Sequence, residues 1–170
     1  MNLHDLRACD ILLYKGTAWT SKLIQWKTTS LYSHVSVVVG SEMNLGIESN
    51  TGSQSGVRAL DLRKLDANII DAFRVKPQNT FEPEKVISYL VDSLGAKFDY
   101  VGVTWLGVLK VLNLTEKANQ FQIKKDYFCS ELVYEAFHAA GLDIVPQVEQ
   151  TDTTSPGDIA RSPRIEKINS

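Results

Sequence analysis

Hydrophobic and polar positions follow two different periods in the two halves of the chain. In the first half, short apolar runs alternate with turn residues, which is typical of strands. These strands follow one another largely through turns, so we expect an antiparallel sheet. The strands are predicted at residues 10–15, 35–39, 45–49, 57–62 and 68–75.

Helical spacing of apolar residues dominates the second half. Pro83 stands where a first turn begins, and Gly95 stands where the apolar stripe ends, as is common at helix termini. A later apolar-periodic segment begins at Cys129 and stops before Gly141. The helices are predicted at residues 83–94, 100–112 and 129–140, with a shorter helical pattern in the first half at 17–27.

Length and pattern together predict one α+β domain over residues 1–170. A chain of 170 residues can bury one ordinary core. We expect that core at about 6–142, followed by a polar, turn-rich tail at 147–170 in which Ser155–Asp158 opens one short helical turn.

Composition and the N-terminal sequence limit the expected binding partners and the expected cellular location of the protein. The chain is 44% hydrophobic and 22% charged with a net charge of −2, which does not favour a nucleic-acid partner. The N-terminus lacks a signal-peptide pattern and two cysteines are sparse for a disulfide scaffold, so we expect a cytoplasmic protein. The most apolar window, Val101–Leu109, is too short to span a bilayer, although contact with a membrane surface stays open. The oligomeric state is not predicted.

Cys129 and His34 are the first candidates for catalysis. Cys129 begins a predicted helix, where the dipole and the backbone N–H groups favour a thiolate nucleophile. His34 stands where a loop meets a buried strand. The structural alternatives are a packed cysteine that acts as a small hydrophobe and a histidine that is hydrogen-bonded at the edge of the core.

Glu48 is the third candidate. If its strand lies antiparallel beside 35–39, the carboxylate falls near His34 and can orient the imidazole as the acid of a triad does. The register that decides this is open in the sequence, and an ordinary surface carboxylate is the alternative. Tyr32, Ser33 and Tyr127 flank the candidates and are predicted to line the substrate cleft, with core packing as the alternative for the tyrosines.

Motifs for metals and phosphates are missing from the sequence. It contains no Cys-x-x-Cys, no His-Glu-x-x-His and no glycine-rich phosphate loop. We therefore predict no metal site, and the cysteine chemistry needs no cofactor.

Six stretches of the chain form a recognisable set: Asp10–Leu13, Tyr32–Val35, Ile47–Glu48, Gly56–Arg58, Phe98–Tyr100 and Tyr127–Val133. Together they resemble the YiiX-like group, a circularly permuted branch of the papain-like superfamily related to NlpC-type amidases, with bacterial and poxvirus members. The order His, acid, Cys is that of the permuted branch. One departure is Cys9, which stands where the group usually has Gly, and we expect it to be a packed residue.

The resemblance implies a small antiparallel sheet or half-barrel packed against a helical subdomain that carries the cysteine helix. It further implies that Cys129 is the nucleophile, His34 the general base and acid, and Glu48 the orienter of His34. The expected activity is that of a thiol amidase or peptidase on small peptide, amino-acid or cell-wall-derived substrates. Two alternatives stay open: a hydrolase or acyltransferase of lipid esters or other acyl substrates, and a binding module without catalysis.

Overall fold

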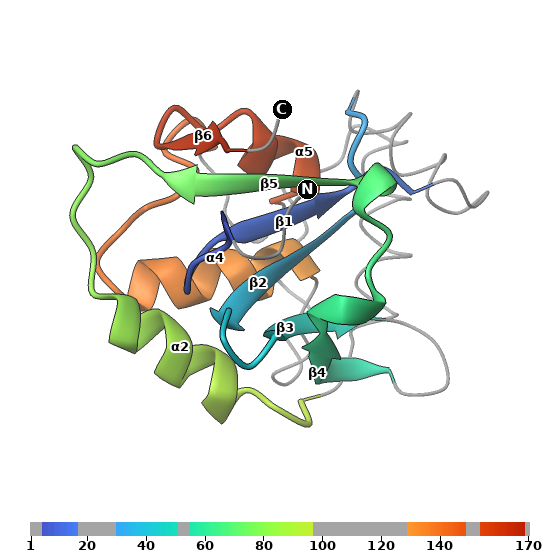
Figure 1. Ribbon diagram of the computed structural model, residues 1–170. Coiled ribbons are helices and arrows are strands. Elements are labelled where there is room, and N and C mark those ends of the chain that lie inside the picture. The colour runs from blue at the N-terminus through green and yellow to red at the C-terminus, as the bar shows by residue number, and fades with distance from the viewer. Residues whose placement is uncertain (1–4, 17–29, 51–54, 97–128, 149–153, 169–170) are drawn as a thin grey trace, which may run out of the picture.

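The computed structural model describes residues 5–16, 30–50, 55–96, 129–148 and 154–168. Within these ranges the chain forms one antiparallel sheet with helices packed against it (Figure 1). The α+β class predicted from the sequence is confirmed.

The sheet has six strands in the described part of the chain, in the spatial order β4-β3-β2-β1-β5-β6. Every adjacent pair is antiparallel. Consecutive strands β2, β3 and β4 form a meander through short connections, whereas β1 pairs with β5 far along the chain. The strands are β1 (Ile11–Tyr14), β2 (His34–Gly40), β3 (Leu45–Asn50), β4 (Gly56–Asp61), β5 (Ile70–Val75) and β6 (Ile165–Lys167).

Five of these strands lie where the apolar runs predicted them. β5 begins at Ile70, because the preceding residues Ala67–Ile69 form a 3₁₀ turn whose start is capped by the Asp66 carboxylate, which accepts from the Asn68 N–H. The sixth strand, β6, was not predicted. It has only three residues, with Ile165 buried, and its pairing with β5 holds it in place.

The described helices are α2 (Pro83–Asp92), α4 (Cys129–Ala139) and α5 (Pro156–Ala160). Both Gly95 and Gly141 have positive φ, at 85° and 87°, the left-handed conformation that glycine supplies after a helix. Ser155 and Asp158 form a reciprocal capping box at the start of α5. The helices predicted at 17–27 and 100–112 lie outside the described residues.

The main core lies between one face of the sheet and α4. Side chains alternate along a strand, so odd positions of β2 point to this face and meet the inward positions of α4. In Figure 1, α4 crosses behind the sheet, and α2 packs beside α4. The apolar residues predicted to face inward on α4 are all buried: Leu132, Val133, Ala136, Phe137 and Ala140.

The C-terminal segment is more ordered than a polar tail. Beyond the expected helical turn it contributes β6 to the sheet, and Ile159 and Ile165 are buried in the main core. The sequence did not predict their burial, because Ile159 and Ile165 are isolated apolar residues in a polar segment and form no periodic pattern.

Candidate active site

His34 is the first residue of β2 and stays partly open, with 21% of its side chain exposed. It lies opposite Tyr14 of β1, and the two ring centroids are 5.0 Å apart at an angle of 56°. The Tyr14 hydroxyl and Ser36 Oγ are in turn 2.8 Å apart. The imidazole therefore rests on a ring that is itself held by a hydrogen bond.

Glu48 reaches His34 from the neighbouring strand. Its partner in the register is Ser36, which lies two residues along β2 from His34. Glu48 Oε2 is 2.8 Å from His34 Nε2, and only 3% of the glutamate side chain is exposed. The sheet register, which the sequence left open, thus brings these two predicted residues together.

The second oxygen of Glu48 is fully engaged. Arg58 of β4 donates to Glu48 Oε1 from Nε at 2.9 Å and from Nη2 at 2.7 Å. Asn50 Nδ2 donates to the same oxygen at 3.1 Å. Buried carboxylates need such partners, and here the partners also fix the direction in which Oε2 points.

Cys129 completes the chain of contacts from the first residue of α4. Its thiol is a hydrogen-bond partner of His34. The next residue, Ser130, is buried and donates from Oγ to the Thr154 carbonyl at 2.6 Å, which anchors the start of the helix.

These contacts set the protonation of the histidine and the glutamate. Burial on its own would lower the pKa of His34, but the hydrogen bonds and negative charges of Cys129 and Glu48 outweigh it and raise the pKa to about 10. Burial would raise the pKa of Glu48, yet the contacts with His34, Arg58 and Asn50 lower it to about 2. The arrangement therefore stabilises the imidazolium form of His34 and the carboxylate form of Glu48.

The predicted cleft residues have three different outcomes. The Tyr32 hydroxyl donates to Asp71 Oδ2 at 2.6 Å, and its ring packs edge-on against Phe73. Ser33 is buried, and its backbone N–H donates to the Tyr14 carbonyl. Tyr127 lies outside the described residues. For all three, a role in substrate binding stays a prediction.

Arg58 and Asn50 are site residues whose roles the sequence reasoning missed. Arg58 pairs directly with Glu48 in the register of β3 and β4, and Asn50 lies two residues along β3 on the same face. An arginine inside a short strand next to a turn is a weak signal on its own. It becomes readable only when the pairing of the two strands is known.

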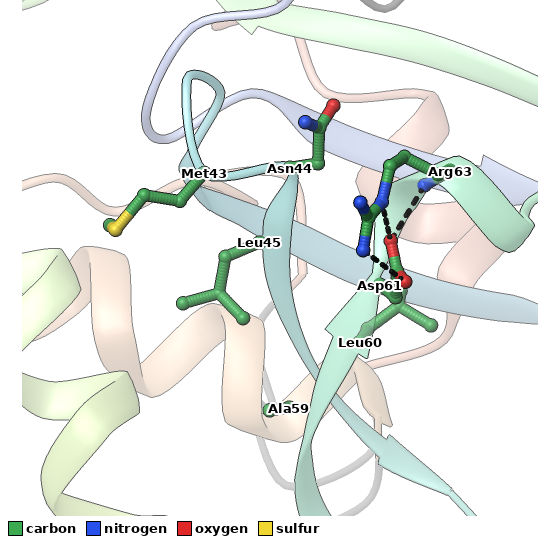
Figure 2. Close-up of a pocket in the computed structure, with 7 residues that line it drawn as sticks. All are labelled: Met43, Asn44, Leu45, Ala59, Leu60, Asp61 and Arg63. Carbon is green, nitrogen blue, oxygen red and sulfur yellow. Dashed lines mark hydrogen bonds and ion pairs between the residues drawn. The ribbon is translucent and has the colours of Figure 1, made fainter.

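A surface pocket lies at the other end of the β3–β4 pair from this site. Figure 2 shows its lining, in which Arg63 and Asp61 form an ion pair at the rim. Leu45 pairs with Asp61 there, whereas the partners of Glu48 lie toward Asn50. The pocket is thus separate from the three candidate residues, and its lining consists of Met43, Asn44, Leu45, Ala59, Leu60, Asp61 and Arg63.

Cys9, the second thiol, lies in the main core with 4% exposure, as expected for a packed residue. Its Sγ is 3.7 Å from the Pro83 carbonyl. Burial, together with the charge of Asp10, raises the pKa of Cys9 to about 12. Its φ of 69° lies in the left-handed region, which glycine adopts more readily than other residues.

Among the described residues, no group of three or more His, Cys, Asp or Glu side chains is placed to hold a metal ion. None of the described helices has the length and apolar character needed to cross a membrane.

Comparison with solved structures places the fold. The chain is similar to the metalloprotein YiiX of Escherichia coli O157:H7, assigned to DUF1105, with a TM-score of 0.68 and 17% sequence identity over 96% of both chains. No family model matches the chain, and no curated protein matches it. The resemblance to the YiiX-like group is confirmed at the level of the fold.

Proposed function

We propose that this protein is a cysteine hydrolase of the amidase or peptidase type, with Cys129 as nucleophile, His34 as general acid and base, and Glu48 as the orienting acid. The observation that carries the proposal is the continuous hydrogen-bonded chain from the Cys129 thiol through the His34 ring to the buried Glu48. Nucleophile, base and orienter in contact are the signature of covalent catalysis.

In the acylation step, the Cys129 thiolate attacks the carbonyl carbon of an amide and forms a C–S bond. The oxygen of the tetrahedral intermediate carries a negative charge, which the positive end of the α4 dipole stabilises. The His34 imidazolium then donates its proton to the amine nitrogen as the C–N bond breaks. A thioester on Cys129 and a free amine result.

In the deacylation step, His34 takes a proton from a water molecule that attacks the thioester. The C–S bond breaks, a carboxylic acid leaves, and the thiolate–imidazolium pair is restored. Glu48 holds the ring in one orientation throughout and stabilises its charged form. The permuted papain-like arrangement, with histidine on an early strand and cysteine at a later helix start, fits this order of residues.

The proposed substrates are small peptides or amide-bearing fragments of the cell wall. The alternative of lipid esters depended on the apolar stretch at 101–112, which lies outside the described residues, and it stays a prediction. Binding without catalysis does not require a thiol, an imidazole and a carboxylate in contact with one another. We therefore favour an enzyme over a binding module.

The test is turnover of a panel of short peptide p-nitroanilides and p-nitrophenyl esters by purified protein. We expect release of p-nitroaniline by the wild type and its loss in Cys129→Ala. The matched control is Cys9→Gly, which removes the other thiol and suits the positive φ at that position. Hydrolysis that persists in Cys129→Ala would exclude this thiol as the nucleophile, and activity confined to the esters would favour the ester hydrolase.

A further inference from the structure

Tyr14, the last residue of β1, touches the proposed catalytic histidine from a strand that carries none of the three residues proposed above. It pairs with His34 in the sheet register, and the centroids of the two rings are 5.0 Å apart at an angle of 56°. The Tyr14 carbonyl also accepts from the backbone N–H of Ser33 at 2.9 Å. Tyr14 therefore contacts both the imidazole and the backbone immediately before it.

The ring of Tyr14 is itself held in place. Its hydroxyl lies 2.8 Å from Oγ of Ser36, a fully buried residue of β2. Its backbone belongs to β1, which lies between β2 and β5 in the sheet (Figure 1). His34 thus lies against a ring whose position is fixed by other contacts. Tyr14 also packs against the smaller core cluster, which consists of Leu6, Leu12, Val38, Leu62, Ile70 and Ala72.

His34 is supported from both neighbouring strands, by Tyr14 of β1 and by Glu48 of β3. Glu48 Oε2 is 2.8 Å from Nε2 of His34. One hydrogen bond fixes the position of one ring atom, but it leaves the plane of the ring free to turn about that atom. The adjacent tyrosine ring restricts this rotation, because it occupies the space into which the imidazole would turn. Glu48 and Tyr14 together therefore fix both the position and the plane of the imidazole.

The charged groups around His34 give this support a measurable effect. Burial would lower the pKa of His34, but Cys129 of α4 and Glu48 of β3 raise it to about 10. Arg58 of β4 lies beyond Glu48 and contacts its other oxygen. Tyr14 stays neutral, because burial and the charge of Glu48 raise its pKa. An imidazole that tilts away from Glu48 loses part of this interaction, so a loosened ring has a lower pKa.

We propose that Tyr14 is a positioning residue for His34 and that it acts through its ring, whereas its hydroxyl serves to hold that ring at Ser36. This inference rests on the proposed function and extends the site to β1. Tyr14 acts on the substrate only through the imidazole, which gives and takes the protons in both steps of the reaction. Its removal therefore affects proton transfer and leaves substrate binding intact.

The experiment separates the ring of Tyr14 from its hydroxyl. Tyr14→Leu removes the ring and keeps an apolar side chain against the smaller core cluster, whereas Tyr14→Phe removes only the hydroxyl. Ser36→Ala removes the partner of that hydroxyl. The matched control is Tyr134→Leu, because Tyr134 is buried and its ring stacks on His138 with the centroids 5.5 Å apart. Steady-state kinetics with the p-nitroanilide that the wild type cleaves give kcat, KM and the pH profile of each protein.

In Tyr14→Leu we expect kcat to fall by about tenfold with KM nearly unchanged, because the proton transfers lose their geometry and substrate binding does not. The alkaline limb of the pH profile should move from about 10 toward the ordinary histidine value of 6.5. Tyr14→Phe and Ser36→Ala should each lose about threefold or less, and the two changes combined should cost no more than either alone, because both break the same contact. Tyr134→Leu should keep the kcat and the pH profile of the wild type.

A Tyr14→Leu protein with the kcat and the alkaline limb of the wild type would overturn the role of Tyr14 and leave the proposed hydrolase standing. A loss in Tyr14→Phe as large as that in Tyr14→Leu would also overturn it, since the hydroxyl would then carry the effect. Circular dichroism checks that each variant folds. If Tyr14→Leu does not fold, Tyr14→Met takes its place with the same expected outcomes.

Titration of the histidine ring protons by NMR measures the same support without turnover. The signal of His34 is identified by its absence from His34→Gln. The pKa of His34 should be lower in Tyr14→Leu than in the wild type and unchanged in Tyr134→Leu. If the wild type cleaves no substrate, the hydrolase is rejected and this titration alone decides the role of Tyr14. Equal pKa values of His34 in Tyr14→Leu and the wild type would overturn that role.

Discussion

The guanidinium of Arg58 directs two hydrogen bonds at a single oxygen of Glu48 and leaves the other oxygen to His34. The two oxygens of the buried Glu48 carboxylate thus have different partners. One oxygen anchors the side chain to the next strand, and the other holds the imidazole. The following predictions test this division and its effect on the cysteine.

The first prediction concerns the charge of Glu48. In Glu48→Gln we expect kcat/KM to fall by about a hundredfold or more, because an amide at this position can donate to Nε2 and favour the wrong tautomer of His34. The wild type should lose activity as the pH rises through about 10, where the imidazolium that protonates the leaving amine loses its proton. In the variant this loss should begin nearer the ordinary histidine value of 6.5.

The control for Glu48→Gln is Asp61→Asn, which makes the same chemical change in a carboxylate paired with Arg63 at the surface. It should leave both the rate and the pH profile unchanged. An unaltered alkaline limb in Glu48→Gln would show that Glu48 does not set the charge of His34.

The second prediction separates positioning from binding at Arg58. Arg58→Gln should lower kcat by about tenfold and leave KM nearly unchanged, because Arg58 acts on the substrate only through Glu48 and His34. Arg58→Lys should recover part of kcat, because lysine restores the positive charge beside Glu48 but not the two N–H donors of the guanidinium. Arg63→Gln is the matched control, because Arg63 makes a similar fork to Asp61 in an exposed position. A change confined to KM would place Arg58 in substrate binding instead.

The third prediction concerns the pH dependence of stability. The pKa of His34 is raised to about 10 in the folded chain, so its contribution is complete below pH 6.5 and is lost as the pH rises through about 10. The pKa of Glu48 is lowered to about 2, so its contribution is complete above pH 4.5 and is lost as the pH falls through about 2.

Urea titrations at a series of pH values measure this dependence. The free energy of unfolding should be highest between about pH 4.5 and 6.5 and decline on both sides. His34→Gln should flatten the alkaline decline, and Glu48→Gln should flatten the acid decline. Curves for the two variants that run parallel to that of the wild type would contradict the assigned charge states.

The fourth prediction concerns which thiol reacts. Iodoacetamide at neutral pH should modify Cys129 and inactivate the protein in the same time course, whereas Cys9 should not react, because it is buried and its pKa is raised to about 12. Mass spectrometry should find one adduct on the native protein and two after denaturation. Modification of Cys9 ahead of Cys129 would contradict this difference between the two sites.

The sequence predicted local elements better than the contacts between them. Val35–Val39 is an almost unbroken β-branched run and the apolar stripe of α4 has helical spacing, and both elements form where these patterns predict them. The strand β6 has too few residues for a period, so only its pairing with β5 reveals it. Periodic patterns within one helix or strand can be seen in the sequence, whereas pairings between distant strands leave no such pattern.

The candidate site shows the same limit. Cys129 at a helix start and His34 at a strand start were readable from position, and Glu48 was readable if the register allowed it. Arg58 was not, because its contact depends on the pairing of β3 with β4.

The meander of β2, β3 and β4 has a consequence for the order of folding. Its short connections make it the most local part of the sheet, and local pairings form early because they cost little loop entropy. We therefore expect His34, Glu48 and Arg58 to meet before α4 docks and delivers Cys129. Pulse-labelling hydrogen exchange should protect amides of β3 before those of α4, and the reverse order would refute this sequence of events. The Cys129 thiol would then meet a histidine, a glutamate and an arginine that are already in contact. Activation of the nucleophile would thus be the last step of folding.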